Sequence, residues 1–207
     1  MGKKALLLLS GSRPAEFDTG ADIVICADSG YVAALDSGIE VDHLVGDMDS
    51  IPPEYLLKAE ELGVKVLSYP ADKDLADGEI ALRLALDLGC DEIRIAGGKH
   101  GRLDHIISTG LLPLLVPGNV NIEVFIGRDR LYLLRAGSEL RTGASGIVSI
   151  IPIGDDAVVS TKGLKWPLDG ETLLPGSTKG IHNEPISETF QIRCEKGRVW
   201  VILMDEG

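Results

Sequence analysis

Residues 23–50 read IVICADSGYVAALDSGIEVDHLVGDMDS. The stretch begins with the apolar run 23–27, continues with a segment that suits a helix over 29–35, and ends with a second apolar run just before Gly46. Apolar runs that alternate with helical segments are typical of βαβ units, in which successive strands lie parallel in one sheet. This stretch therefore predicts an α/β fold.

The same alternation extends in both directions, from about Lys4 to about Gly127. Further strands are predicted at 5–9, 64–68, 93–96 and 122–126. Helices are predicted over 54–62, with Pro53 in the first turn and Gly63 as the stop, over 74–88, and from Arg102 towards Leu115. These elements predict a Rossmann-like domain over residues 1–127, with a mostly parallel sheet and flanking helices.

The pattern changes after Gly127. Short strand-like runs are separated by Gly, Pro and Asp turns, and no helical repeat is present; the runs are 131–134, 147–151, 157–160, 190–194 and 199–203. Closely spaced strands of this kind are typical of an all-β module. We therefore predict a second, all-β domain over residues 128–207.

The composition narrows the range of partners. Acidic residues outnumber basic ones, 32 to 20, and no run of Lys or Arg is present, so we expect no nucleic-acid partner. An acidic protein can still bind a polyphosphate through a divalent cation. The apolar runs 5–9 and 111–116 are too short for a secretory signal and a membrane span, so we expect a cytoplasmic protein that does not enter a membrane.

Carboxylates follow several of the predicted strands. Asp28 follows the second strand, Asp47 and Asp49 the third, and Asp74 and Asp77 the fourth. In an open α/β sheet the carboxyl ends of the strands form the ligand-binding edge. A single Asp at such a place is more often a helix cap or a turn residue. Several together repel one another, and a hard cation such as Mg²⁺ or Mn²⁺ relieves that repulsion.

Local spacing ranks these carboxylates. Asp47 and Asp49 project from the same side of an extended segment and have the strongest claim as metal ligands, while Gly46 leaves room beside the backbone. Asp74 and Asp77 lie three residues apart at a predicted helix start, where the helix dipole also favours phosphate. The glycine-rich turn 97–101, which opens the next helix, suits either a phosphate cradle or a purely structural turn.

Taken in order, the motifs resemble the thiamine pyrophosphokinase family. They are ADSG at 27–30, GDMDS at 46–50, DKDLADGE at 72–79, GGKHGRLDH at 97–105 and GLKWPL at 163–168. The resemblance implies an α/β catalytic domain that binds ATP and Mg²⁺, and a β-sandwich domain that contributes to thiamine binding and dimerisation. It also implies a homodimer with interface active sites, and transfer of the terminal diphosphate of ATP to the thiamine hydroxyl with release of AMP.

The resemblance also implies roles for individual residues. Asp47 and Asp49, assisted by Asp28 and Asp77, are expected to bind Mg²⁺. Lys99 and Arg102 are expected to neutralise the phosphate charge, Asp104 to orient Arg102 or the nucleotide, and Asp74 to bind the nucleotide. Trp166 and Asn183 are expected to bind the acceptor. Trp166 suits this role because an indole face attracts a cationic aromatic ring, although a Trp in a sandwich core is the alternative. The chain departs from the family pattern at Ser29, Ala76, His100 and His182.

Two other functions fit part of the pattern. A nucleotide-sugar transferase also uses an Asp-x-Asp metal pair after a parallel strand, but it does not require the aspartates of the other loops. A sensor of thiamine diphosphate or nucleotide would keep the fold without turnover. The intact set of carboxylates favours the enzyme.

Overall fold

The computed structural model describes residues 2–12, 20–70, 72, 74–98, 102–143 and 146–204. The chain divides into two compact units, Met1–Gly127 and Arg128–Gly207. Among the described helices, none has the length and apolar character needed to cross a membrane.

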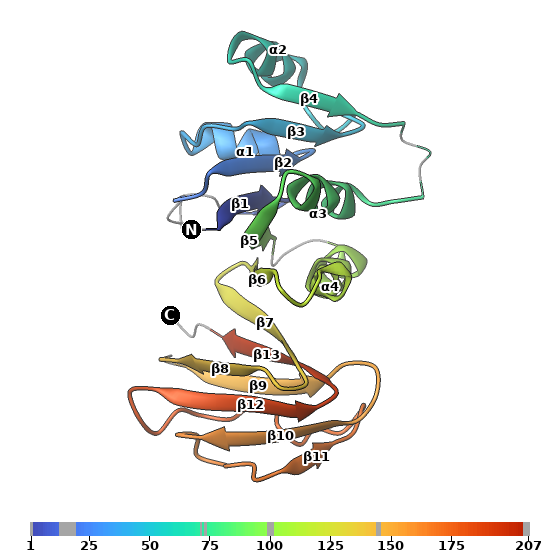
Figure 1. Cartoon of the computed structure of the whole chain (residues 1–207). Helices are drawn as coiled ribbons and strands as arrows, with labels where there is room; N and C mark the ends of the chain where they lie inside the picture. Colours follow the sequence, from blue (N-terminus) through green and yellow to red (C-terminus); the bar gives the residue numbers. More distant parts are fainter. Residues whose placement is uncertain are drawn as a thin grey trace. The chain divides into compact units, whose positions relative to one another are not determined.

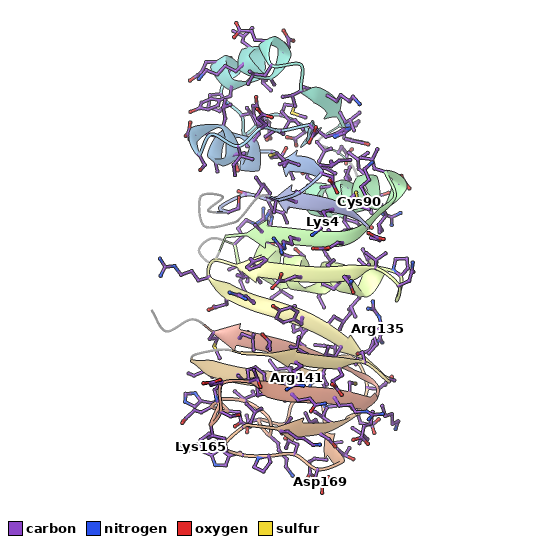
Figure 2. The ribbon with its side chains drawn as sticks, turned by 60° about the vertical axis from the view of Figure 1, so that its left-hand side comes forward. Lys4, Cys90, Arg135, Arg141, Lys165 and Asp169 are labelled. Atoms are coloured by element: carbon purple, nitrogen blue, oxygen red, sulfur yellow. The ribbon has the colours of Figure 1, made fainter. Side chains whose placement is uncertain are left out.

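Parallel strands form the centre of the first unit (Figure 1). They are β1 (Lys3–Leu8), β2 (Ile23–Ala27), β3 (His43–Gly46), β4 (Lys65–Ser68), β5 (Cys90–Gly97) and β6 (Asn121–Ile126), in the order β4-β3-β2-β1-β5-β6. Each neighbouring pair is parallel. Lys4 and Cys90, labelled in Figure 2, mark the starts of the central strands β1 and β5.

The order of the strands determines where a ligand can bind. The chain runs outward from β1 through β2 and β3 to β4, and then returns to place β5 on the other side of β1. Neighbouring strands whose connections lead in opposite directions leave a crevice at their carboxyl ends. That crevice lies beyond Leu8 of β1 and Gly97 of β5.

Helices cover this sheet. They are α1 (Gly30–Asp36), α2 (Pro53–Glu61), α3 (Asp77–Asp87) and α4 (Leu103–Leu111), which continues as the 3₁₀ helix η2 (Leu112–Leu115). Tyr31 and Ala34 of α1 and Ala59 of α2 pack in one buried cluster with strand residues such as Leu6 and Leu44. Figure 1 shows α3 and α4 on one side of the strands.

The start of α3 differs from the prediction. Ala76 is extended, with φ −70° and ψ 149°, and acts as the N-cap, so the helix begins at Asp77 rather than at Asp74. Asp74 therefore lies before the helix and does not share a helical face with Asp77. The first turn of α3 contains Asp77 and Glu79, and negative charge there is favoured by the helix dipole.

The second unit is a β-sandwich. Its strands are β7 (Asp129–Arg135), β8 (Glu139–Thr142), β9 (Ile147–Pro152), β10 (Ala157–Lys162), β11 (Glu171–Leu173), β12 (Phe190–Lys196) and β13 (Arg198–Met204). They form two antiparallel layers, β7-β13-β9 and β11-β10-β12-β8. One buried cluster joins residues of both layers, including Ile150 and Val201 from the first and Val159 and Ile192 from the second. The predicted fold class is confirmed.

Candidate active site

A cavity of about 590 Å³ lies at the crevice between β1 and β5. Its polar wall is formed by residues after the strands and at the helix starts, including Ser10, Asp28, Asp77, Gly98 and Arg102. Its apolar wall comes from α4 and η2 and includes Ile106, Leu111, Leu112, Leu114 and Leu115. A volume of this size, with a mostly apolar lining and a few polar groups, is typical of sites for small molecules and cofactors.

Asp28 is held in this wall by an unusual backbone. Its φ is +46°, in the left-handed region, which Asp adopts more readily than most residues. Its carboxylate lies directly against Gly46 of β3, and a Cβ atom at position 46 would overlap Asp28 Oδ1. Gly46 itself has φ +144°. The space that we expected for a ligand beside Gly46 is therefore occupied by the carboxylate of Asp28.

Asp47 and Asp49 lie close together, but for a different reason from the predicted one. The segment after β3 is a turn rather than an extended strand, because Met48 has φ +67°. The Asp49 backbone N–H donates to Asp47 Oδ1 over 3.0 Å. The turn therefore brings together two carboxylates that an extended chain would only have placed on the same side.

Asp77 completes a group of negative charges. The pKa of Asp49 is raised, mainly by its hydrogen bond with Asp47 and the charge of that residue, and also by the charge of Asp77. Asp77 shares the cavity wall with Asp28. The carboxylates predicted to bind metal therefore lie close to one another, although they come from segments after three different strands.

These carboxylates suit a divalent cation for which the protein supplies only one or two ligands. Within the described ranges, no three His, Cys, Asp or Glu side chains are arranged as a ready-made metal cluster. Mg²⁺ usually takes only one or two carboxylates and completes its octahedron with water and substrate phosphates. The hydrogen bond with Asp47 is the main cause of the raised pKa of Asp49, and the charges of Asp47 and Asp77, which also raise it, are what such an ion would offset. The assignment of all four aspartates as ligands remains a prediction.

Arg102 and Asp104 form a two-pronged ion pair at the start of α4. Arg102 Nη2 donates to Asp104 Oδ2 over 2.6 Å, and Nε donates to Oδ1 over 3.2 Å. The pair lowers the pKa of Asp104 and raises that of Arg102, in each case mainly through the hydrogen bond. Because Arg102 also lines the cavity, Asp104 holds a cation at the cavity wall.

Lys99 and Asp74 were also predicted to contact the nucleotide. Lys99 lies outside the described residues, as does the neighbouring His100. Asp74 is exposed and is not among the residues that line the cavity. In contrast, Ser10 and Gly11 line the cavity although no prediction singled them out. They follow β1, so the strand-end rule that selected the aspartates applies to them as well.

The second unit contains the two residues predicted to bind the acceptor. The Trp166 side chain is 51% exposed, which excludes the alternative of a sandwich-core residue. Lys165 Nζ lies 4.6 Å from the centre of the indole ring and is paired with Glu184 over 2.9 Å. Lys165 and Asp169, labelled in Figure 2, lie on the same edge of the unit, in the segment between β10 and β11.

Asn183, the second residue predicted to contact the acceptor, is buried. It is only 3% exposed, and its carboxamide is bonded to the main chain around Trp166. The Trp166 partners lie 17 residues away, so these bonds could not be predicted from the sequence.

Comparison with known proteins identifies the family. A family model described as "Thiamin pyrophosphokinase, catalytic domain" matches residues 16–126, and one described as "Thiamin pyrophosphokinase, vitamin B1 binding domain" matches residues 139–199. The chain belongs to the thiamin pyrophosphokinase family. The two models together cover most of both units.

Individual members of the thiamin pyrophosphokinase family resemble the chain along most of its length. A thiamine pyrophosphokinase of Bacillus subtilis is 31% identical over 179 residues, which cover 84% of this chain and 83% of the relative. Thiamine pyrophosphokinase 1 of Oryza sativa subsp. japonica is 25% identical over 218 residues, covering 88% and 79% of the two chains.

Solved structures give the same result for the fold. The crystal structure of the Bacillus subtilis enzyme matches with a TM-score of 0.87 and 25% identity, covering 99% of this chain and all of that one. The thiamin pyrophosphokinase of Geobacillus thermodenitrificans matches with a TM-score of 0.82 and 26% identity, covering 99% of each chain. The predicted membership of the thiamine pyrophosphokinase family is confirmed.

Proposed function

We propose that the chain is a Mg²⁺-dependent enzyme that transfers the terminal diphosphate of ATP to the hydroxyl group of thiamine. The observation that carries the proposal is the group of carboxylates at the sheet crevice, in a chain whose two units match the catalytic and vitamin B1 binding models of one kinase family. Such a group suits a metal-bound polyphosphate better than it suits a neutral ligand.

The proposed reaction is a single in-line displacement. The thiamine hydroxyl oxygen forms a bond to the β-phosphorus of ATP, the bond from that phosphorus to the α,β-bridging oxygen breaks, and AMP leaves. The hydroxyl proton is lost to solvent or to a nearby base. Such transfers depend mainly on positioning and on neutralising the phosphate charge, so the protein needs to supply little covalent chemistry.

The carboxylates, the Arg102–Asp104 pair and the apolar wall of the cavity each have a role in this proposal. Asp47 and Asp49, with Asp28 and Asp77, would hold Mg²⁺, which supplies positive charge to the phosphate oxygens when it is bound. Arg102, oriented by Asp104, would contact the phosphates, and Lys99 is proposed for the same role. The apolar wall formed by α4 and η2 suits the nucleotide base.

The alternative functions have less support. A nucleotide-sugar transferase does not account for Asp28 and Asp77 beside the Asp-x-Asp pair, or for the vitamin B1 binding model that matches residues 139–199. A sensor without turnover would not require the closely placed carboxylates to be kept.

The direct test is to incubate the purified protein with ATP, Mg²⁺ and thiamine. We expect AMP and thiamine diphosphate in equal amounts, and neither product when EDTA is added or thiamine is omitted. Binding of both substrates without products would favour the sensor and contradict the proposal.

A homodimer is part of the proposal, and a pair of exposed apolar residues supports it. Leu103 and Ile107 lie one turn apart on α4, are not among the residues that line the cavity, and are 69% and 49% exposed. A second copy of the chain that covers this pair would remove it from water.

We expect sedimentation velocity to give twice the mass of the chain, and Ile107→Glu to shift the protein towards monomer without unfolding it. Leu57→Glu, at an exposed apolar position on α2, is the matched control and should remain dimeric. A fully active monomer of the unmodified protein would contradict the dimer.

A further inference from the structure

Asn183 is anchored in the sandwich by its own backbone. Its N–H donates to the Val148 carbonyl, and its carbonyl accepts from the Val148 N–H, each over 2.8 Å. Val148 belongs to β9 and is fully buried. The preceding residue, His182, donates its N–H to Ser149 Oγ over 3.1 Å and has φ +60°. The backbone of Asn183 is therefore held against β9, the edge strand of its layer.

The carboxamide of Asn183 holds the main chain of Trp166 on both sides. Oδ1 accepts from the Trp166 N–H over 3.1 Å and from the Glu184 N–H over 3.0 Å, while Nδ2 donates to the Trp166 carbonyl over 2.7 Å. An Asn side chain offers two lone pairs and two N–H donors. These bonds leave one N–H, on a side chain that is 3% exposed.

The neighbouring residues extend this connection. The Lys165 N–H donates to the Glu184 carbonyl over 2.9 Å, and Leu164 and Pro185 form an isolated bridge. The exposed indole of Trp166 therefore projects from a segment whose main chain is fixed.

We propose that Asn183 is a positioning residue for the acceptor: it acts by fixing the Trp166 main chain and thus the indole, rather than by touching thiamine. This rests on the proposed function, in which Trp166 stacks on the acceptor. An aromatic side chain on a loop without such hydrogen bonds would lose conformational entropy when the acceptor binds, and this loss would weaken binding. A loop that is already ordered in the free protein avoids this loss of entropy on binding.

Asn183→Asp is the most informative variant. It has nearly the same shape and keeps an acceptor for the Trp166 and Glu184 N–H groups, but it replaces the Nδ2 donor by an oxygen facing the Trp166 carbonyl. Asn183→Ser is a smaller second variant in case the buried carboxylate prevents folding. Ser138→Ala is the matched control. Like Asn183, Ser138 uses its side chain to bond both the N–H and the carbonyl of one residue, here Arg135. Ser138 lies in the turn between β7 and β8, so the control removes a similar pair of bonds at another place.

Two readouts separate positioning from a general loss of structure. The chain has two tryptophans, so in a Trp200→Phe background the time-resolved fluorescence anisotropy of the free protein reports Trp166 alone. We expect Asn183→Asp to increase the fast loss of anisotropy. We also expect it to raise the KM for thiamine about threefold to tenfold, as when a side chain must be re-ordered on binding. The KM for ATP, kcat at saturating thiamine and all values for Ser138→Ala should stay the same.

The outcomes are distinct. A higher KM for thiamine with unchanged indole motion would mean that Asn183 touches the acceptor, and it would overturn the proposal. Unchanged values in folded Asn183→Asp and Asn183→Ser would overturn it too. If the parent protein transferred no diphosphate, the proposed function would fail, while the anisotropy would still report whether Asn183 orders Trp166.

Discussion

Asp47→Asn and Asp49→Asn should each lower the rate of diphosphate transfer by about 100-fold or more, while the fold stays intact. Metal-ion catalysis depends on charge placed beside the reacting phosphates, and the loss of a ligand carboxylate weakens that placement. Initial rates of AMP formation at saturating ATP and thiamine, over a range of Mg²⁺ concentrations, measure the effect. Excess Mg²⁺ should restore part of the rate if the carboxylate acts by holding the metal.

The matched control is Asp87→Asn, at the exposed carboxyl-terminal end of α3. It changes the net charge by the same amount away from the cavity and should leave the rate unchanged. Full activity in both the Asp47 and the Asp49 variants would contradict the metal assignment.

The raised pKa of Asp49 also predicts that the stability of the fold depends on pH when no metal is bound. The folded-state pKa of Asp49 is raised above the ordinary aspartate value of 3.8, so between the two pKa values the folded chain binds more protons than the unfolded chain. Stability must then fall as the pH rises through this interval. Thermal unfolding in EDTA should show this fall for the unmodified protein and a smaller one for Asp49→Asn. Added Mg²⁺ should reduce the difference.

The parts of the fold that were predicted are those with a strong local signal. β2 occupies the predicted range 23–27 because all of its residues are apolar and buried, as expected for a strand covered on both faces. The strands β8 and β11 were missed. Their sequences, ELRT and ETL, contain no apolar run, and their places depend on pairing with β12 and β10.

The predicted part of the candidate site comes from one rule, that ligand-binding residues follow the carboxyl ends of parallel strands. That rule brought Asp28, Asp47 and Asp77 to one edge, and the structure places them close together. It does not predict the left-handed backbone of Met48, which only the folded surroundings can hold, nor the extended Ala76 that moves the start of α3. Nor does it predict that Asn183 is buried and bonded to the main chain of Trp166, because burial by distant residues leaves no local trace.

Trp166→Ala should weaken thiamine binding about 5- to 30-fold while leaving the affinity for ATP and Mg²⁺ unchanged. A desolvated contact between a cation and an indole face is worth about 1 to 2 kcal/mol, which corresponds to this range. Lys165 Nζ already lies 4.6 Å from the ring centre, so this face attracts a cation in the free chain. Because the side chain is 51% exposed, its removal should scarcely change the melting temperature. Calorimetric titration with thiamine and, separately, with a non-hydrolysable ATP analogue measures both affinities.

Lys165→Ala distinguishes stacking on the indole from a general effect of the loop. It removes the resident cation and its pair with Glu184 but leaves the three hydrogen bonds between Asn183 and the main chain of residues 166 and 184. If thiamine uses the indole face that Lys165 covers, this variant should bind thiamine at least as tightly as the unmodified protein, because a competing cation is gone. A truncated core tryptophan would instead cost about 3 to 5 kcal/mol of stability. A large fall in melting temperature with parallel loss of both affinities in Trp166→Ala would therefore show that the indole serves the fold, and the acceptor would have to be recognised elsewhere.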